Sequence, residues 1–460
     1  MEATRIDDAM VGELAGSFSG ELLVPESRGY DAARHIYNGL IDKHPGLIAR
    51  CTSVRDVAAA IDFARAHRLE VSVRGGGHGV AGRAVTEGGV MIDLAPMKRI
   101  DVDPEARTVR AQGGVTWGEL DAATAVHGLA TTGGVISTTG IGGLTLGGGF
   151  GYLMGSYGMA ADNLVSVELV TADGAIVNAS TNEQADLFWA LRGAGANFGV
   201  AASLTYRLHP VTEIVGGVIA HPFEAARDFL RFYRDFSDDV DDELYTFAGL
   251  GHAPDGSGVP IAVAVVGHSG GEEAANAQLK PLLEFGSPLI AQVGPMPYPA
   301  INTMFDEGYP KGSLNYWKSS FLREFDDEAI EHMIETFAAC PSPMTGAVVE
   351  HFHGAATRVG ATETAVPHRE AGFDYLLTSV WMDPAVSDRN VTWTREAYSA
   401  MEPQMLDRRY VNYLSEDDDG ASGPSVYGVN HDRLAEIKAR YDPENVFHLN
   451  QNIRPKAPPG

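Results

Sequence analysis

The first 210 residues alternate short apolar runs with helix-like segments, a pattern typical of a fold that mixes helices and strands. Residues 46–50 and 90–94 are apolar runs that predict short strands. Between them Ser53 is placed to cap a helix, because Val57 and Ile61 follow it at helical spacing. This part of the chain therefore predicts short elements joined by many turns.

The same alternation continues toward residue 210. Residues 116–127 predict a helix, with Thr116 and Glu119 spaced as a capping box. Residues 165–171 alternate as a strand, and the following Asp-Gly pair at 173–174 marks a turn into another strand. Helices and strands are thus both expected throughout this half.

The pattern changes near Pro210. Residues 211–424 carry fewer glycine clusters and more aromatic side chains, and a chain of 460 residues exceeds what one core usually supports. We expect a second domain here, an antiparallel sheet covered by helices, followed by a C-terminal segment (425–460) with a helix at 430–441. Three aromatic residues are expected in the core of this second domain: Tyr375, Trp381 and Trp393.

Charge and composition narrow the possible partners. The chain has 34 Lys and Arg against 61 Asp and Glu, a formal net charge of -27. Such a surface repels nucleic acid and anionic membranes, so we expect neither as a partner. The chain lacks a signal-peptide pattern and any run of ~18 apolar residues, so we expect a cytoplasmic protein. Cys51 and Cys340 lie far apart and indicate no disulfide framework.

Two glycine-rich loops carry the strongest functional signal. The first, Arg74-Gly-Gly-Gly-His-Gly79, follows the strand-like residues 70–73, and the second covers residues 133–151, nine of which are glycine. Glycine lets backbone N–H groups approach a phosphate or cofactor where a Cβ would clash. Arg74 brings a permanent positive charge to the same place. Together the loops predict an extended cofactor that bears phosphate.

A nicotinamide-binding interpretation of the first loop has to be weighed. Residues 77–82 formally match the pattern GxGxxG. That interpretation requires a helix that opens at the loop and a crossover to the next parallel strand. Only residues 83–89 separate the pattern from the next strand, whereas a crossover takes at least ~10–12 residues. We therefore expect no nicotinamide domain.

A series of further motifs follows in one order along the chain. After Arg74-Gly-Gly-Gly-His78 come Gly-Val-Thr-Trp-Gly-Glu-Leu at 114–120, the second glycine loop, Tyr-Gly-Met-Ala-Ala-Asp-Asn at 157–163, Val-Thr-Ala-Asp-Gly at 170–174, Asp-Leu-Phe-Trp-Ala-Leu-Arg-Gly at 186–193, Asn-Phe-Gly-Val at 197–200, Tyr-Gly-Val-Asn at 427–430, Tyr-Asp-Pro-Glu-Asn-Val-Phe at 441–447 and Asn-Gln-Asn-Ile at 450–453. In this combination the chain resembles the berberine-bridge-enzyme-like oxidases of the vanillyl-alcohol-oxidase class, over nearly its whole length.

The resemblance implies an α+β fold with three parts. Residues 1–210 would form a two-part PCMH-type FAD-binding domain. Residues 211–424 would form the substrate domain, with an antiparallel sheet covered by helices. Residues 425–460 would form the berberine-bridge-enzyme-like segment, which returns to the FAD domain.

The resemblance also implies FAD attached covalently through His78 only. In this family the matching histidine bonds to the flavin 8α-methyl, and a cysteine often provides a second link. Ile136 occupies the cysteine position, and Leu144 replaces a histidine common in doubly linked members. The chain is similar in this respect to the singly tethered bacterial branch, which includes the flavoenzyme of enterocin biosynthesis. Judged by spacing alone, a loop histidine hydrogen-bonded to backbone is the better explanation of His78, and the whole motif series reverses this order.

A set of residues is expected to hold this cofactor. Glycines of the first loop would bind the pyrophosphate, glycines of the second would close over the cofactor, Val200 would pair with the adenine side and Asn450 would approach the flavin ring. The predicted cofactor-binding residues are Arg74, Gly75, Gly76, Gly77, His78, Gly79, Gly134, Thr138, Gly142, Gly143, Gly147, Val200 and Asn450.

Two residues are candidates for the base that accepts the substrate's hydroxyl proton during hydride transfer to flavin N5. Some family members carry a Glu or Gln where this chain has Leu376, which cannot act as a base. The family's other base is the second tyrosine of a Tyr-x-Asn-Tyr strand, here Tyr413. Glu350 is the second candidate, although an ordinary strand carboxylate explains it equally well. His351 and His353 share the other strand face, and without a third ligand we expect no metal site.

The resemblance implies an FAD-dependent oxidase that takes a hydride from an alcohol, a sugar-like compound or a secondary metabolite and passes the electrons to O₂, giving H₂O₂. Three alternatives stay open. They are a tailoring oxidase or oxygenase of natural-product biosynthesis with a polyketide-like substrate, a dehydrogenase with another electron acceptor, and a flavin-holding protein without catalysis. The substrate, the pathway and the oligomeric state carry no sequence signal.

Overall fold

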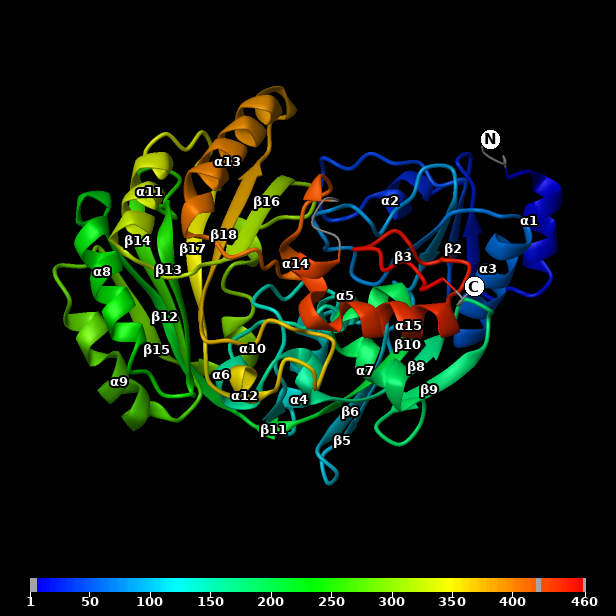
Figure 1. Cartoon of the computed structure of the whole chain (residues 1–460), viewed down its shortest axis with the longest axis horizontal. Coiled ribbons are helices and arrows are strands. Elements are labelled where there is room, and N and C mark those ends of the chain that lie inside the picture. The colour runs from blue at the N-terminus through cyan, green and yellow to red at the C-terminus, as the bar shows by residue number, and fades with distance from the viewer. Residues whose placement is uncertain (1–5, 419–422, 458–460) are drawn as a thin grey trace.

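The computed structural model describes residues 6–418 and 423–457. The first five residues of the N-terminal segment and the last three of the C-terminal segment lie outside the described residues. Figure 1 shows one part built on the N-terminal sheets, a second part built on one large sheet, and a C-terminal segment that returns to the first part. The predicted mixture of helices and sheets is confirmed.

The N-terminal sheet has the strand order β1-β2-β4-β3. Its elements are β1 (Glu21–Leu23), β2 (Leu47–Arg50), β3 (Val71–Arg74) and β4 (Val90–Asp93), with α1 (Asp8–Ala15), α2 (Tyr30–Arg34) and α3 (Val54–Ala66). α3 begins where the sequence predicts, because the side chains of Ser53 and Asp56 cap each other's backbone N–H groups. Its apolar face, which includes Val57 and Ile61, is completely buried.

The pairing of β3 with β4 corrects one step of the sequence argument. The two strands are parallel neighbours, joined by residues 75–89 without a helix. The sequence argument counts only residues 83–89 as the crossover, whereas the whole loop from Gly75 onward makes the connection. The argument against a nicotinamide domain therefore rests on the missing helix at residues 75–89, not on the length of the connection.

A second sheet, in the order β5-β6-β10-β8-β9, completes the first part and is antiparallel throughout. Its strands are β5 (Ile100–Asp103), β6 (Thr108–Gln112), β8 (Leu164–Val170), β9 (Ile176–Ser180) and β10 (Val200–Arg207); a small pair is formed by β7 (Leu129–Ala130) and β11 (His209–Pro210). The accompanying helices are α4 (Trp117–Ala125), α5 (Ile141–Leu146), α6 (Met154–Tyr157) and α7 (Ala185–Ala194). Glu119 accepts a hydrogen bond from the Thr116 N–H at 2.8 Å, which places the start of α4 as predicted.

The large sheet has the order β15-β12-β14-β13-β17-β18-β16, and every pairing in it is antiparallel. Its strands are β12 (Glu213–Pro222), β13 (Leu244–His252), β14 (Pro260–His268), β15 (Ile290–Pro297), β16 (Leu314–Phe321), β17 (Gly346–Phe352) and β18 (Gly372–Trp381). The helices are α8 (Ala226–Ser237), α9 (Glu272–Glu284), α10 (Tyr298–Ile301), α11 (Asp327–Phe337), α12 (Ala355–Arg358) and α13 (Ser387–Met401). Figure 1 shows α8, α9, α11 and α13 on the outer face, which leaves the inner face toward the first part.

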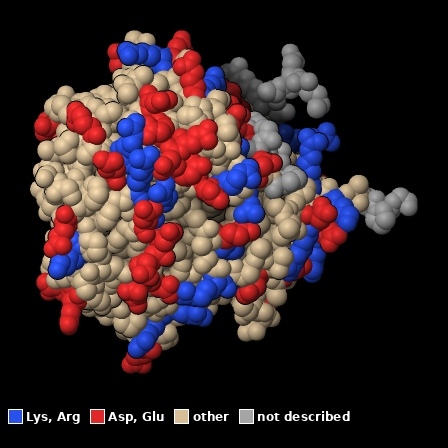
Figure 2. All heavy atoms as spheres, turned by 60° about the vertical axis from the view of Figure 1, so that its left-hand side comes forward, with Lys and Arg blue, Asp and Glu red and all other residues tan. Residues whose placement is uncertain are grey.

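The helices bind this sheet through apolar stripes. In α8, Phe229, Leu230 and Tyr233 recur at helical spacing and are fully buried. As predicted, Tyr375, Trp381 and Trp393 lie in the core. The outer surface of these helices is charged, and Figure 2 shows basic side chains lying among acidic ones there. Such pairs include Arg231 of α8 with Asp327 of α11, at 2.9 Å, so the acidic excess is partly neutralised on this side.

The C-terminal segment lies against the first part. It contains α14 (Pro424–Tyr427) and α15 (His431–Tyr441), and α15 packs on α7. The fully buried Lys438 donates to the Asp442 carboxylate at 2.6 Å and to the carbonyl oxygens of Asn197 and Phe447 at 2.6 and 2.9 Å. These hydrogen bonds join the C-terminal segment to the 197–200 motif. Within residues 6–418 and 423–457, none of the helices has the length and apolar character that crossing a membrane requires.

Candidate active site

A cavity of about 420 Å³ lies between the two glycine loops, the C-terminal segment and the inner face of the large sheet. Most residues predicted to bind the cofactor line it: Gly75, Gly76, Gly77, His78, Gly79, Gly134, Gly142, Gly143, Val200 and Asn450. Both candidate bases, Glu350 and Tyr413, line the same cavity. The fold therefore brings together segments that are far apart in the sequence.

The glycines of the two loops serve two purposes. At the point where the loops cross, a Cβ on Gly76 would lie only 2.4 Å from the backbone nitrogen of Gly140, so glycine is required for this contact. At Gly79 and Gly143 a Cβ would meet no atom within 4 Å, and both positions line the cavity. Glycine at these two positions leaves the space free for a bound group.

Three predicted cofactor residues do not line the cavity. The Arg74 guanidinium donates to both carboxylate oxygens of Asp93, at 2.9 and 2.6 Å, and to the carbonyl of Ala33. Its charge is thus neutralised by Asp93, and its role is to hold the start of the loop. Thr138 is exposed. These two predictions are corrected by the geometry.

Gly147 is the third correction. It was expected to close over the cofactor, but a Cβ there would lie 2.1 Å from the side-chain oxygen of Asn412. The Asn412 amide donates to the Leu144 carbonyl at 3.0 Å and to the Tyr410 hydroxyl at 2.8 Å. Gly147 therefore makes room for the segment that carries Tyr413, and its effect on the cavity is indirect.

His78 stands on the cavity wall with a neutral ring. Tyr37 stacks on it, with ring centres 3.8 Å apart and planes 13° from parallel. The surrounding protein desolvates the ring and lowers its pKa from 6.5 to about 4. Its Nε2 is buried and has no hydrogen-bond partner among the described residues. An uncharged imidazole keeps a lone pair available at neutral pH, which is what bond formation to an electrophilic carbon requires.

The Tyr410–Tyr413 segment is a 3₁₀ turn with Val411–Tyr413 as its helical part, not the predicted strand. The Tyr410 hydroxyl accepts a hydrogen bond from the Gly149 N–H at 2.8 Å, and its ring stacks on Phe150 at 3.9 Å. Tyr410 therefore points toward the second glycine loop, and the Tyr413 ring lies edge-on to Phe150 with ring centres 6.1 Å apart. This places Tyr413 on the cavity wall even though the predicted element was wrong.

Glu350 is the carboxylate on the inner face of the large sheet that lines the cavity. It is only 4% exposed. The Tyr245 hydroxyl donates to its Oε1 at 2.6 Å, while Oε2 has no partner among the described residues. Burial raises the pKa of Glu350 above its ordinary value, and the hydroxyls of Tyr245 and Tyr413 oppose this rise. For Tyr413, burial and the nearby Glu350 raise the pKa well above 10.

Asp374 is a neighbouring acid that the sequence did not single out. It pairs with Glu350 across β17 and β18, so both side chains are on one face of the sheet. Asp374 is completely buried, and neither of its carboxylate oxygens has a partner in the described chain. Burial and the Glu350 charge raise its pKa well above the ordinary value. The signal for this pair lies in the strand register, which sequence spacing does not give.

The His351 and His353 rings stack on each other at 4.4 Å, and His351 also packs on Phe373. Burial and the neighbouring His353 lower the pKa of His351 to about 3. Within the described part of the chain, no group of three or more His, Cys, Asp or Glu side chains is placed to hold a metal ion. The stacked rings account for both histidines as packing residues.

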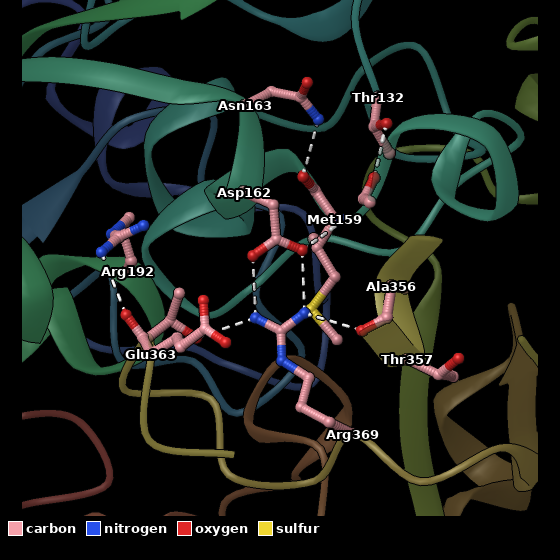
Figure 3. Close-up of polar contacts among 12 residues, drawn as sticks. Thr132, Met159, Asp162, Asn163, Arg192, Ala356, Thr357, Glu363 and Arg369 are labelled. Carbon is pink, nitrogen blue, oxygen red and sulfur yellow. Dashed lines mark hydrogen bonds and ion pairs between the residues drawn. The ribbon is translucent and has the colours of Figure 1, made fainter. Parts of the chain in front are cut away.

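A buried ion pair between Arg369 and Asp162 holds two loops of the chain together. Arg369 binds both carboxylate oxygens of Asp162 at 2.8 Å and also donates to the Thr364 hydroxyl and the Ala356 carbonyl. Figure 3 shows the guanidinium facing the carboxylate, with Met159 and Ala356 around it. The pair joins the 157–163 motif to the segment that precedes β18. A motif in the first part is thereby fixed to the second part.

Comparisons with known proteins agree with this geometry. Residues 45–180 match the family described as "FAD binding domain", and residues 409–454 match the family described as "Berberine and berberine like". The (R)-6-hydroxynicotine oxidase of Paenarthrobacter nicotinovorans is 31% identical over 458 residues, which cover 96% of this chain and 98% of the relative. The chain belongs to the berberine-bridge-enzyme-like family of FAD-linked oxidoreductases.

Other members of this family extend the comparison. An FAD-linked oxidoreductase of Dictyostelium discoideum is 29% identical over 415 residues, 89% of each chain. The solved structure of 6-hydroxy-D-nicotine oxidase from Arthrobacter nicotinovorans matches with a TM-score of 0.88 at 29% identity, over 96% of this chain and 99% of that one. A xylooligosaccharide oxidase from Myceliophthora thermophila matches with a TM-score of 0.85 over 98% of this chain and 100% of that one. At 22% identity it supports the fold alone.

The cavity of this berberine-bridge-enzyme-like oxidoreductase fits its family's cofactor. Two loops of backbone groups face it, the glycines leave open space where side chains would intrude, and His78 presents an unpartnered ring nitrogen in the same wall. Ile136 and Leu144, both in the second glycine loop, contribute hydrocarbon side chains to the cavity wall. Neither of these two side chains can form a covalent link to a flavin.

Proposed function

We propose that this enzyme is an FAD-dependent oxidase of an alcohol, which removes a hydride from the carbon that bears the hydroxyl and passes the electrons to O₂, giving H₂O₂. When bound, FAD supplies the hydride acceptor, its ring nitrogen N5. We also propose that His78 is its single covalent attachment, as in the singly tethered bacterial branch. We propose that residues 1–210 and 425–460 bind FAD and that residues 211–424 bind the substrate.

One observation carries the proposal: a buried carboxylate, Glu350, lines the cavity, and one of its oxygens has no partner among the described residues. Hydride leaves a carbon more readily when a base takes the hydroxyl proton at the same time. Burial raises the pKa of Glu350, which makes its carboxylate a stronger base than an exposed one. Oε2 can accept the substrate proton while Tyr245 holds Oε1. Glu350 is therefore our first candidate for the base.

Tyr413 becomes the second candidate, which reverses the order that the sequence suggested. Its pKa lies well above 10, so the phenol keeps its proton at neutral pH. A protonated phenol donates a hydrogen bond, and both the Glu350 carboxylate and a substrate oxygen are suitable acceptors. We propose that Tyr413 orients the substrate hydroxyl toward Glu350.

The test is the rate of flavin reduction without oxygen, measured with an alcohol that reduces the wild-type enzyme. We expect Glu350→Gln to slow reduction by roughly 10²–10⁴-fold, the usual contribution of a general base, and Tyr413→Phe to slow it less. Because the carboxylate is the active form, the wild-type rate should rise with pH through a pKa above 4.5. This rise should disappear in Glu350→Gln. A larger loss in Tyr413→Phe, with the pH profile of Glu350→Gln unchanged, would assign the base to Tyr413.

The attachment and the electron acceptor are tested separately. Flavin colour that stays with acid-precipitated protein, and is lost from the precipitate of His78→Ala, would support the single histidyl link. Reoxidation by air with one H₂O₂ per substrate would support an oxidase. Reduced flavin that stays reduced in air and is reoxidised by an artificial acceptor would identify a dehydrogenase instead.

A further inference from the structure

The part of the cavity wall contributed by the second half of the chain is mostly hydrocarbon. It is built by side chains from four strands of the large sheet and from the loops beside them. Its apolar members are Phe247, Phe305, Trp317, Val348 and Leu376, and Phe150 of the second glycine loop also lines the cavity. Aromatic rings at such a surface bind flat apolar groups through their faces and edges.

Several polar atoms on this wall are already used within the protein. The Tyr309 hydroxyl and the Thr378 hydroxyl bind each other at 3.0 Å. The Trp317 Nε1–H donates to Asn315 at 3.2 Å, and the Tyr410 hydroxyl is held by Gly149 and Asn412. Among buried side-chain oxygens of the described residues on this wall, Glu350 Oε2 is the one left without a partner. The wall therefore offers one acceptor without a partner, Glu350 Oε2, and the Tyr413 hydroxyl that we propose orients the same substrate hydroxyl, in an otherwise apolar surround.

We propose that the substrate is a flat, mostly apolar alcohol, such as a ring-bearing hydroxymethyl compound, whose single hydroxyl meets Glu350. This rests on the proposed function and narrows it. A sugar presents several hydroxyls, and each one beyond the first would lose its hydrogen bonds to water against this wall without gaining a protein partner. Sugar-like substrates are therefore disfavoured, even though the fold is shared with a xylooligosaccharide oxidase.

The test uses the holoenzyme without oxygen and two pairs of probes matched in ring size and reacting group. Benzyl alcohol is compared with D-glucose, and 2-naphthalenemethanol with cellobiose. Binding is measured from the change in flavin absorbance before reduction, and chemistry from loss of the oxidised flavin band. Since one hydroxyl more or less changes selectivity by up to roughly 10²-fold, we expect the aromatic member of each pair to half-saturate at least ~100-fold below the sugar.

Val348→Thr provides a further measurement, because it adds a hydroxyl to the wall at nearly constant volume. It should weaken binding of 2-naphthalenemethanol several-fold while flavin content stays normal. Val259→Thr, at a position that is 53% exposed, is the matched control and should change nothing.

The outcomes separate this inference from the function on which it rests. Saturable perturbation by the aromatic alcohols without reduction would keep the substrate class and reject alcohol oxidation. Reduction by cellobiose at concentrations equal to or below those of 2-naphthalenemethanol would keep the oxidase proposal and overturn the substrate class. No perturbation by either aromatic probe would also overturn it.

Discussion

Asp121 provides the sharpest test of how burial controls charge in this protein. It lies on α4, is 1% exposed, and accepts one hydrogen bond at Oδ2 from the Asn302 amide, at 2.7 Å. Its Oδ1 has no partner among the described residues. Burial raises its pKa from 3.8 to about 7. The native protein therefore holds a proton at this site at pH values where the unfolded chain has already lost it.

The size of the effect follows from this difference in pKa. The contribution of protonated Asp121 to the free energy of unfolding is fully present below pH 3.8. It falls as the unfolded chain ionises, and it is lost once the pH passes about 7. A gap of roughly three pH units at about 1.4 kcal/mol each gives ~4 kcal/mol as the upper limit of the loss. Asp121→Asn removes the titration, and its amide oxygen can keep the bond from Asn302. The variant should match the wild type near pH 4 and exceed its stability by up to ~4 kcal/mol at pH 8.

The assay is urea unfolding of FAD-loaded protein at pH 5 and pH 8, followed by far-UV circular dichroism. Asp239→Asn, at an exposed position, serves as the control and should have the same small effect at both pH values. A stability difference between Asp121→Asn and the wild type that is the same at both pH values would refute the reasoning, because it would mean that native Asp121 does not hold a proton in this range.

Two other predictions concern contacts beside the cavity. Tyr37→Leu removes the ring that stacks on His78, so it should lower the acid-stable fraction of bound flavin, whereas Tyr37→Phe keeps the stack and should retain it; equal loss in both variants would reject a role for stacking. Asp162→Asn leaves the buried Arg369 charge without its partner and should destabilise the protein by ~3–5 kcal/mol in urea unfolding. Asp242→Asn, which breaks the more exposed pair with Arg358, should cost no more than ~1 kcal/mol, and equal costs would contradict this account.

Local signals in the sequence were sufficient for much of the fold. The starts of α3 and α4 were predicted because their capping residues lie within three positions of one another. The antiparallel large sheet and the aromatic residues in its core were predicted from the composition and pattern of residues 211–424. The cavity itself was anticipated because glycine at closely spaced positions has few explanations other than a backbone that must approach a bound group.

The errors at Arg74 and at Tyr410–Tyr413 both involve partners that are distant in the sequence. Arg74 was assigned to the cofactor because its partner Asp93 is set by the parallel register of β3 and β4, a pairing that the sequence argument had dismissed. The alternation in Tyr410–Tyr413 suits a strand, but the segment turns because Asn412 and Tyr410 bind groups more than 250 residues away. Neither partner leaves a signal within the motif.

Burial acts in opposite directions on the two residues that matter most in the cavity. Desolvation disfavours whichever form is charged, so it lowers the pKa of His78 and raises that of Glu350. The first shift keeps the imidazole uncharged, as the bond that we propose to the flavin requires. The second makes Glu350 a stronger base for the role that we propose for it. Asp374, opposite Glu350, is shifted in the same direction as Glu350, because burial and the Glu350 charge raise its pKa. Burial away from water thus favours the proposed role of each residue, His78 as the attachment point of the flavin and Glu350 as the base.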